Sequence, residues 1–219
     1  MTGGPGADTL KGEGGIDTIS YATAAGPLTL NLATRANNQG DTLSGFENAK
    51  GTAADDRITG TRTANRIEGL GGNDNLKGGA GDDVLLGGSG NDTISGGGGG
   101  DTLNGGPGVD TVSYASQPAV TITLGGANNA GDTVSQMENV NGSRFADTIT
   151  GNAGANLING GRGGDTLNGA GGNDTIIGKG GKDTIDGGGP STNPGDKCRG
   201  NTNPVGQQDV LTNCEDSIP

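Results

Sequence analysis

The hydrophobic pattern of this chain has a period of nine residues, in which one large aliphatic residue follows a glycine-rich stretch and an acidic residue. Fourteen blocks fit the form GGxGxDxUx, with U the aliphatic residue, over residues 3–20, 51–113 and 142–186. A fixed repeat of this length predicts a solenoid. The expected inward-facing residues are Leu10, Ile19, Ile58, Ile67, Leu76, Leu85, Ile94, Leu103, Val112, Ile149, Ile158, Leu167, Ile176 and Ile185.

Each block divides into a turn and a short strand. Its first six residues have turn chemistry, because glycine permits positive φ angles and close backbone approach. Its last three residues, such as 93–95, suit a strand whose middle side chain points inward. Two blocks would form one coil of 18 residues with a strand on each side. The pattern therefore predicts an all-β fold with two parallel sheets facing each other across an aliphatic ladder, and no helix.

Two similar segments interrupt the blocks, at residues 21–50 and 114–141. Both begin with Tyr-Ala, continue with an alternating strand (28–32 and 120–124), and then contain Gly-Asp-Thr and Glu-Asn. The chain is thus a tandem duplication, and we expect the inserts to continue the solenoid, with Tyr21 and Tyr114 as packing residues. The expected units are 1–104 (repeats 3–20, insert 21–50, repeats 51–104), 105–186 (repeat 105–113, insert 114–141, repeats 142–186) and a C-terminal cap, 187–219.

Composition changes this picture in one respect, the nature of the partner. With 50 glycines, 28% hydrophobic residues and a net charge of -12, composition alone would indicate disorder, but the regular aliphatic spacing argues against it. The acidic balance disfavours nucleic acid and anionic membranes as partners. No apolar run is long enough to span a membrane, and MTGGPGADTL lacks the features of a signal peptide.

The sixth position of each block carries the candidate metal ligands. Because alternate blocks lie on the same side, these acids form rows about 4.8 Å apart, where neighbouring carboxylates repel by roughly 0.9 kcal/mol even in water. Carboxylates and inward carbonyls form an all-oxygen shell that suits calcium better than magnesium, and the absence of His disfavours zinc and copper. We expect about eight Ca2+ ions. The expected ligands are Asp8, Asp17, Asp56, Asp74, Asp83, Asp92, Asp101, Asp110, Asp147, Asp165, Asp174 and Asp183, with Asn at positions 65 and 156.

Other acidic residues leave two interpretations open. Asp at a turn commonly caps its own backbone, and this is the simpler interpretation for the single Gly-Asp-Thr segments that contain Asp41 and Asp132. Metal ligation is the alternative for both. Near the C-terminus, the segments around Asp196 and Asp209 also resemble part of the block, and the same two interpretations apply.

The blocks resemble the hemolysin-type calcium-binding repeat, or RTX repeat, and residues 87–95, GGSGNDTIS, are a near-ideal copy. The resemblance implies a right-handed parallel β-roll that folds on binding calcium and belongs to a protein exported from a bacterium. Residues 51–54 and 142–145 depart from the pattern because their glycines are substituted, and Asn65 and Asn156 replace the acid. We expect weaker or missing calcium sites there.

The segment 187–219 has a different character from the blocks. Cys198 and Cys214 enclose 15 residues, and in an exported chain such a pair is read as a disulfide, which stabilises by about 3 kcal/mol, rather than as two free thiols. We expect a disulfide-pinned cap on the last coil. Cysteines and a polar C-terminus favour a general secretory route over one-step export.

These features predict a secreted, monomeric calcium-binding module and not an enzyme. Without His the chain has no Ser-His-Asp or Cys-His arrangement, and its carboxylates repeat at one type of position, which disfavours a sugar-hydrolysing pair. One alternative is recognition of a polysaccharide, a cell surface or ice by outward Thr rows, at the seventh position of nine blocks. The simpler explanation of those rows is that Thr, as a β-branched residue, is favoured in β-strands. Another alternative is the calcium-binding part of a larger exported enzyme or toxin.

Overall fold

The computed structural model describes residues 1–126, 128, 130–189, 195–200, 209–214 and 216–217. All regular elements among these residues are short β-strands, almost all of them paired in parallel. No helix in the described part of the chain is long and apolar enough to cross a membrane. The chain forms two compact units, Met1–Asp110 with Gly131–Gln136, and Thr111–Ala130 with Met137–Pro219.

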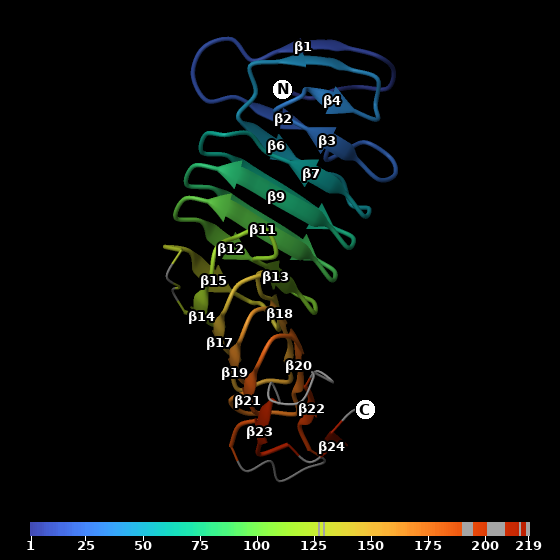
Figure 1. Ribbon diagram of the computed structural model, residues 1–219. Helices are drawn as coiled ribbons and strands as arrows, with labels where there is room; N and C mark the ends of the chain where they lie inside the picture. Colours follow the sequence, from blue (N-terminus) through green and yellow to red (C-terminus); the bar gives the residue numbers. More distant parts are fainter. Residues whose placement is uncertain (127, 129, 190–194, 201–208, 215, 218–219) are drawn as a thin grey trace. The chain divides into compact units, whose positions relative to one another are not determined.

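The first unit stacks its strands as rungs of parallel sheets (Figure 1). One sheet has the order β15-β12-β10-β8-β6-β2, facing it runs β11-β9-β7-β3-β4, and β1 pairs with β5. Only the β3–β4 pair of this unit is antiparallel among the described pairings. The strands are β1 (Thr9–Lys11), β2 (Thr18–Ser20), β3 (Thr29–Asn31), β4 (Ala36–Asn37), β5 (Thr42–Ser44), β6 (Asn48–Lys50), β7 (Arg57–Thr59), β8 (Arg66–Gly71), β9 (Asn75–Ala80), β10 (Val84–Ser89), β11 (Thr93–Gly98), β12 (Thr102–Asn104) and β15 (Thr133–Ser135).

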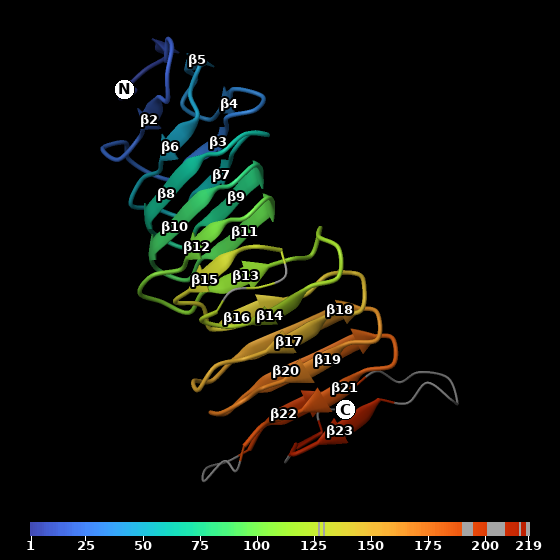
Figure 2. The ribbon, with the colours of Figure 1, turned by 90° about the vertical axis from the view of Figure 1, so that its left-hand side faces the viewer.

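The second unit repeats this arrangement with the orders β24-β22-β20-β18-β16-β13 and β14-β17-β19-β21-β23. In Figure 2, β17, β19 and β21 lie side by side as successive rungs. Its strands are β13 (Thr111–Ser113), β14 (Thr121–Thr123), β16 (Asn139–Asn141), β17 (Thr148–Thr150), β18 (Leu157–Arg162), β19 (Thr166–Asn168), β20 (Thr175–Gly180), β21 (Thr184–Asp186), β22 (Lys197–Arg199), β23 (Val210–Thr212) and β24 (Asp216–Ser217).

Strand register confirms the predicted coil of 18 residues. Ile94 of β11 lies opposite Leu76 of β9, and Leu85 of β10 lies opposite Ile67 of β8. The same spacing joins Leu167 to Ile149 in the second unit. The fold is therefore a parallel β-roll, as the nine-residue pattern predicts.

The aliphatic ladder is the core of both units. Thirteen of the fourteen expected inward residues are buried, with exposed fractions of 0 or 1%, as for Ile94 and Leu167. Leu10 is the exception and is only partly buried, because β1 at the end of the roll has a single neighbouring strand, β5.

The inserts continue the roll, as expected. In the first unit, β3, β5 and β6 of the insert pair with β7, β1 and β2 of the blocks. Their inward side chains, such as Leu30 and Leu43, join the core. Tyr21 and Tyr114 are buried, which confirms their packing role. The hydroxyl of Tyr21 also donates a hydrogen bond of 2.7 Å to Asp41.

The C-terminal segment adds strands to the roll, because β22 pairs with β20 and β23 pairs with β21. A disulfide joins Cys198 to Cys214, with their Cα atoms 5.7 Å apart, so the expected pairing is confirmed. Residues 190–194, 201–208, 215 and 218–219 of the expected cap lie outside the described residues.

Outward Thr residues align best in the second unit. Thr121, Thr148, Thr166 and Thr184 lie in register on four neighbouring strands, and all four are exposed. In the first unit the corresponding rows contain Arg57 and Asn75, or Arg66 and Val84.

Candidate metal centre

Acidic residues at the sixth position form continuous hydrogen-bonded rows. In the blocks after the inserts, the backbone N–H groups of eleven sixth residues each donate to Oδ1 of an Asp one coil later, at 2.7–2.9 Å. One carboxylate oxygen of each Asp is thereby used to lock neighbouring coils together. The rows run Asp56-Asp74-Asp92-Asp110 and Asn65-Asp83-Asp101-Asp132 in the first unit, and Asp147-Asp165-Asp183-Asp209 and Asn156-Asp174-Asp196 in the second.

The second carboxylate oxygen, Oδ2, has a different status. In seven of these Asp residues it is buried and has no hydrogen-bond partner among the described residues. These residues are at most 2% exposed, so bulk solvent does not reach the oxygen. A buried charged oxygen without a partner carries a large desolvation penalty, which a bound cation would remove. The seven are Asp74, Asp83, Asp92, Asp101, Asp165, Asp174 and Asp183.

The first glycine of each block forms the wall behind this oxygen. A Cβ atom on Gly87 would collide with Oδ2 of Asp92 and would lie 2.6 Å from the carbonyl oxygen of Gly105, one coil later. Gly78 has the same relation to Asp83 and to the carbonyl of Gly96. Carboxylate and carbonyl oxygens therefore converge on a space that only glycine leaves free, which is the ligand chemistry that calcium requires.

Burial raises the pKa of these carboxyl groups. Desolvation is the largest cause, and the neighbouring carboxylates of the row add to it at most of these positions. The charged form is therefore disfavoured in the fold unless a cation is present. The pKa rises to about 7 for Asp74 and Asp165, to about 6 for Asp83 and Asp174, and in the same direction for Asp92, Asp101 and Asp183.

The four blocks that follow the inserts have a different turn, and we call them the capped blocks: 51–59, 60–68, 142–150 and 151–159. In each, the backbone N–H of the second residue donates to the side chain of the sixth residue, at 2.6–2.8 Å. The N–H of Thr52 bonds to Oδ2 of Asp56, and the N–H of Ser143 bonds to Oδ2 of Asp147. The hydroxyl groups of Thr52 and Ser143 also donate to Oδ1, at 2.9 Å.

The second residue also closes the turn of each capped block. The hydroxyl oxygen of Thr52 accepts from the N–H of Ala54, and that of Ser143 accepts from the N–H of Phe145. In the other blocks after the inserts, which we call the open blocks (69–113 and 160–186), the second residue has a positive φ. Glycine is favoured there, although Leu70, Ala170 and Lys179 also adopt this conformation.

Asn65 and Asn156 are satisfied by the Glu-Asn pair of each insert. The side-chain amide of Asn65 donates to the carbonyl oxygen of Glu47 at 2.5 Å, and that of Asn156 donates to the carbonyl of Glu138 at 2.8 Å. In a regular coil, the backbone carbonyl at this position accepts the N–H of the seventh residue one coil later, as the carbonyl of Asp74 accepts from the N–H of Thr93.

Beside the inserts, the side-chain oxygen of Asn48 accepts the N–H of Arg66 instead, and the side-chain oxygen of Asn139 accepts the N–H of Leu157. The carbonyl groups of the Glu residues are thereby left for the amides. The Asn residues are thus matched hydrogen-bonding partners and not only weakened versions of Asp.

The expected ligands do not all lie in this environment. Asp74, Asp83, Asp92, Asp101, Asp165, Asp174 and Asp183 do, while Asp56 and Asp147 lie in capped blocks. Asp110 continues the row of Asp92, and its Oδ2 is likewise buried against the first glycine of its block, Gly105. Asp8 and Asp17 are only partly buried at the end of the roll, and the N–H of Gly4 donates to Oδ2 of Asp8.

Four further Asp residues occupy row positions. Asp41 accepts from the N–H of Asp8, Asp132 from Asp101, Asp196 from Asp174 and Asp209 from Asp183. In the sequence, each of these residues is an Asp two residues before a hydrophobic residue of a strand. The sequence spacing does not reveal their positions in the rows, because Asp132 lies 31 residues after Asp101 instead of 18.

Side chains alone do not form a metal cluster. Within the described ranges, no group of three or more His, Cys, Asp or Glu residues is placed to hold a metal ion. An ion beside an orphaned Oδ2 would therefore take most of its ligands from backbone carbonyls, which the converging glycine turns supply.

The comparison with family models agrees with this geometry. The model described as RTX calcium-binding nonapeptide repeat matches residues 2–20, 50–85, 77–112, 137–167 and 160–189. These ranges contain both the open and the capped blocks and leave out most of each insert. No curated protein matches the chain. With more than half of its length matched and the turn geometry in place, the chain belongs to the family of RTX calcium-binding nonapeptide repeat proteins.

Proposed function

We propose that this chain is a secreted calcium-binding β-roll whose ions lie in the turns of the open blocks. The observation that carries the proposal is the set of seven buried Oδ2 atoms without hydrogen-bond partners, each above a glycine. If no cation bound there, such oxygens would be expected to accept a hydrogen bond from an N–H or a hydroxyl group, as the carboxylate oxygens of Asp56 do in a capped block. The contrast between the two kinds of block within one chain argues for a cation in the open ones.

Calcium suits these positions better than other cations do. All candidate ligands are oxygens, and the turns offer many carbonyl groups in a flexible arrangement. Magnesium requires a tight octahedron and usually keeps several water ligands, whereas these turns offer mainly carbonyl and carboxylate oxygens. The chain has no His, and its two Cys residues form the disulfide, so the ligands preferred by zinc and copper are missing.

The ions divide unevenly among the blocks. One ion beside each of the seven orphaned oxygens gives a stoichiometry close to the eight expected from the repeat pattern. Asp56 and Asp147 would not contribute Oδ2, because Thr52 and Ser143 already donate to it. The capped blocks would therefore remain free of calcium on that side.

Folding of the open blocks would depend on calcium. Without an ion, each buried carboxylate must either remain charged and unpaired or take up a proton, and both weaken the fold at neutral pH. Extracellular modules of this kind bind calcium near millimolar concentration. Such coupling suits a chain that is exported unfolded and folds outside the cell, where it would act as a structural or binding module and not as an enzyme.

A calcium titration followed by far-UV circular dichroism tests this proposal. We expect a cooperative gain of β-signal at millimolar calcium, and a much smaller gain with magnesium at the same concentration. Native mass spectrometry of the loaded protein should then count about seven bound ions. A full β-signal in excess chelator, or equal folding by magnesium, would contradict the proposal.

A matched pair of variants locates the ions. Asp83→Asn removes the charge from an open block, whereas Asp56→Asn does so in a capped block. The first should raise the calcium concentration needed for folding and lower the ion count, and the second should leave the count unchanged. Equal loss in both variants would place ions in the capped blocks as well.

A further inference from the structure

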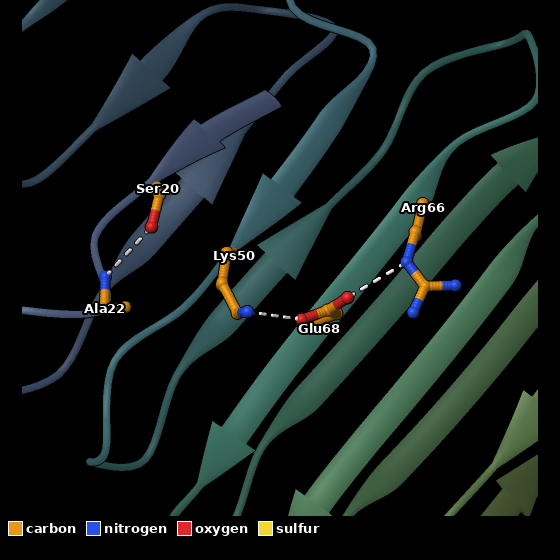
Figure 3. A network of polar contacts seen from close by, with 5 residues as sticks. All are labelled: Ser20, Ala22, Lys50, Arg66 and Glu68. Carbon is orange, nitrogen blue, oxygen red and sulfur yellow. Dashed lines mark hydrogen bonds and ion pairs between the residues drawn. The ribbon is translucent and has the colours of Figure 1, made fainter. Parts of the chain in front are cut away.

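The two copies of the duplicated unit differ in charge along one edge of the roll, where Lys50, Arg66 and Glu68 lie in the first unit (Figure 3). In the first unit, Glu68 lies between Lys50 and Arg66 and forms an ion pair with each, at 2.9 Å (Figure 3). These ion pairs lower the pKa of Glu68, chiefly through the hydrogen bond from Lys50. The charges at this edge are therefore compensated within the protein.

In the second unit, neutral residues stand at the equivalent positions. Counting from the first block after each insert, Asn141, Leu157 and Asn159 replace Lys50, Arg66 and Glu68. The side-chain amide of Asn159 donates to Asn141 at 3.2 Å, so neighbouring strands still meet through polar side chains. The equivalent edge of the second unit is therefore uncharged at these three positions.

Cations appear instead on the turns beside this surface. Arg144, Arg162 and Lys179 stand where the first unit has Ala53, Gly71 and Gly88. The three belong to successive coils, because the N–H of Arg162 donates to the carbonyl of Ser143, and Gly161 lies opposite Lys179.

Together these residues line an open pocket of about 590 Å³, which we call the basic groove. Its lining includes Arg144, Arg162 and Lys179, with Asn141, Asn159 and Ser113. No Asp or Glu lines it, and the ion pairs recorded in the described part of the chain all lie at Glu68. All three cationic side chains are exposed.

Stacked cations without counter-ions repel one another, and in a chain with a net charge of -12 their concentration at one edge is conspicuous. An anionic ligand would remove that repulsion. Two guanidinium groups suit planar carboxylates, which they bind through paired hydrogen bonds, and Lys179 adds a point charge. The Asn and Ser side chains can donate to and accept from hydroxyl groups.

We propose that the basic groove of the second unit binds an acidic oligosaccharide, whose carboxylates pair with Arg144, Arg162 and Lys179 and whose hydroxyl groups contact Asn141 and Asn159. No aromatic side chain lines the groove, so it lacks the stacking platforms with which proteins bind single-stranded nucleic acid. The acidic remainder of the chain also repels a long polyanion. A short, hydroxyl-rich acid fits both conditions, and this proposal does not depend on where calcium binds.

Binding of tetragalacturonate tests the proposal directly. The calcium-loaded protein would be titrated by calorimetry at a buffered free calcium concentration, because the sugar itself binds calcium. Maltotetraose is the neutral control of the same length. We expect measurable binding of the acidic sugar, weakening at high salt, and no binding of the neutral one. Equal binding of both sugars, or of neither, would overturn the proposal.

Two triple variants with the same net charge separate the groove from general electrostatics. Arg144→Gln, Arg162→Gln and Lys179→Gln together should weaken binding more than about tenfold. The matched control is Arg57→Gln, Arg62→Gln and Lys77→Gln, which removes three exposed cations of the first unit and should change binding less than about twofold.

Circular dichroism would verify that both variants still fold with calcium. Equal weakening in the two, or equally tight binding of a single-stranded DNA tetramer by the wild type, would contradict a saccharide site.

Discussion

The backbone N–H of Asp74 donates a hydrogen bond of 2.7 Å to Oδ1 of Asp92, which lies one coil later. The same bond recurs along all four rows, so each Asp of the open blocks has two roles. Its Oδ1 joins one coil to the preceding coil, while its Oδ2 lies buried beside a glycine. Mechanical coupling between coils and the proposed calcium binding therefore depend on the same side chain.

Replacing Asp92 by Ala should weaken both the link between coils and the proposed calcium binding. The N–H of Asp74 would lose its acceptor, and one proposed calcium ligand would be lost. We expect the calcium-loaded protein to lose about 2–3 kcal/mol of unfolding free energy, measured by urea denaturation. Asp17→Ala is the control, since Asp17 lies partly exposed near the end of the roll and should cost less than about 1 kcal/mol. Equal losses would argue against the special role of the interior rows.

The capped turns should stabilise the chain whether or not calcium is present. Thr52→Ala removes a hydroxyl that donates to Asp56 and accepts from the N–H of Ala54. We expect a loss of about 1–2 kcal/mol that is the same in calcium and at the lowest calcium concentration that still supports folding. A loss that appears only with calcium would mean that this turn also holds an ion.

Asn65→Asp should remove a hydrogen bond without creating a good calcium site. The variant lacks the amide that donates to the Glu47 carbonyl, and the new carboxylate is buried. Unfolding free energy should fall by about 1–3 kcal/mol, and the bound-ion count from native mass spectrometry should not rise. A variant of unchanged stability with one additional ion would show that Asn65 merely substitutes for a ligand.

Stability without calcium should increase toward acid pH, opposite to the usual acid denaturation. The pKa of Asp74 and Asp165 is raised to about 7, and that of Asp83 and Asp174 to about 6, whereas an unfolded Asp titrates near 4. Between those values the folded state binds more protons than the unfolded state does. The contribution is fully present below about pH 4 and is lost as the pH rises through 6 to 7.

Without calcium, the far-UV circular dichroism β-signal should therefore be larger at pH 4.5 than at pH 8, two settings that bracket the raised pKa values. In excess calcium the order should reverse, because protons compete with the ion for the same carboxylates. A β-signal that rises with pH in the absence of calcium would contradict the assignment of these groups as buried and unpaired.

Reduction of the Cys198–Cys214 disulfide should act on the end of the second unit. The bridge closes a short loop beside β22 and β23, so its loss should cost up to about 3 kcal/mol in that unit. Hydrogen exchange of Cys198→Ser with Cys214→Ser should show faster exchange in β20–β23 and unchanged rates in β8–β11. Uniform acceleration in both units would contradict a local role.

Sequence periodicity predicted the roll well because the constraint repeats. An aliphatic residue every nine positions allows one winding, and the pairs Ile94–Leu76 and Leu167–Ile149 have the register that this winding requires. The row positions of Asp132 and Asp41 were not predictable in the same way. Their neighbours are 31 and 33 residues away, so loop length conceals the register.

The capped turns were also beyond the sequence pattern. In the sequence, Thr52 and Asn65 are departures from the repeat pattern. The structure is needed to show that Thr52 donates a hydrogen bond to Asp56 and that Asn65 donates one to Glu47. Side-chain hydrogen bonds of this kind depend on φ at the second position, which a non-glycine residue does not determine, since Leu70 and Thr52 adopt different conformations there.

The most direct test of the central claim is a crystal structure of the calcium-loaded protein, with ions located from their anomalous signal. We predict peaks beside Oδ2 of Asp74, Asp83, Asp92, Asp101, Asp165, Asp174 and Asp183, each also within 2.3–2.6 Å of backbone carbonyl oxygens. No peak should lie beside Oδ2 of Asp56 or Asp147. Empty turns beside these seven Asp residues, or ions distributed equally over them and the capped blocks, would contradict the account.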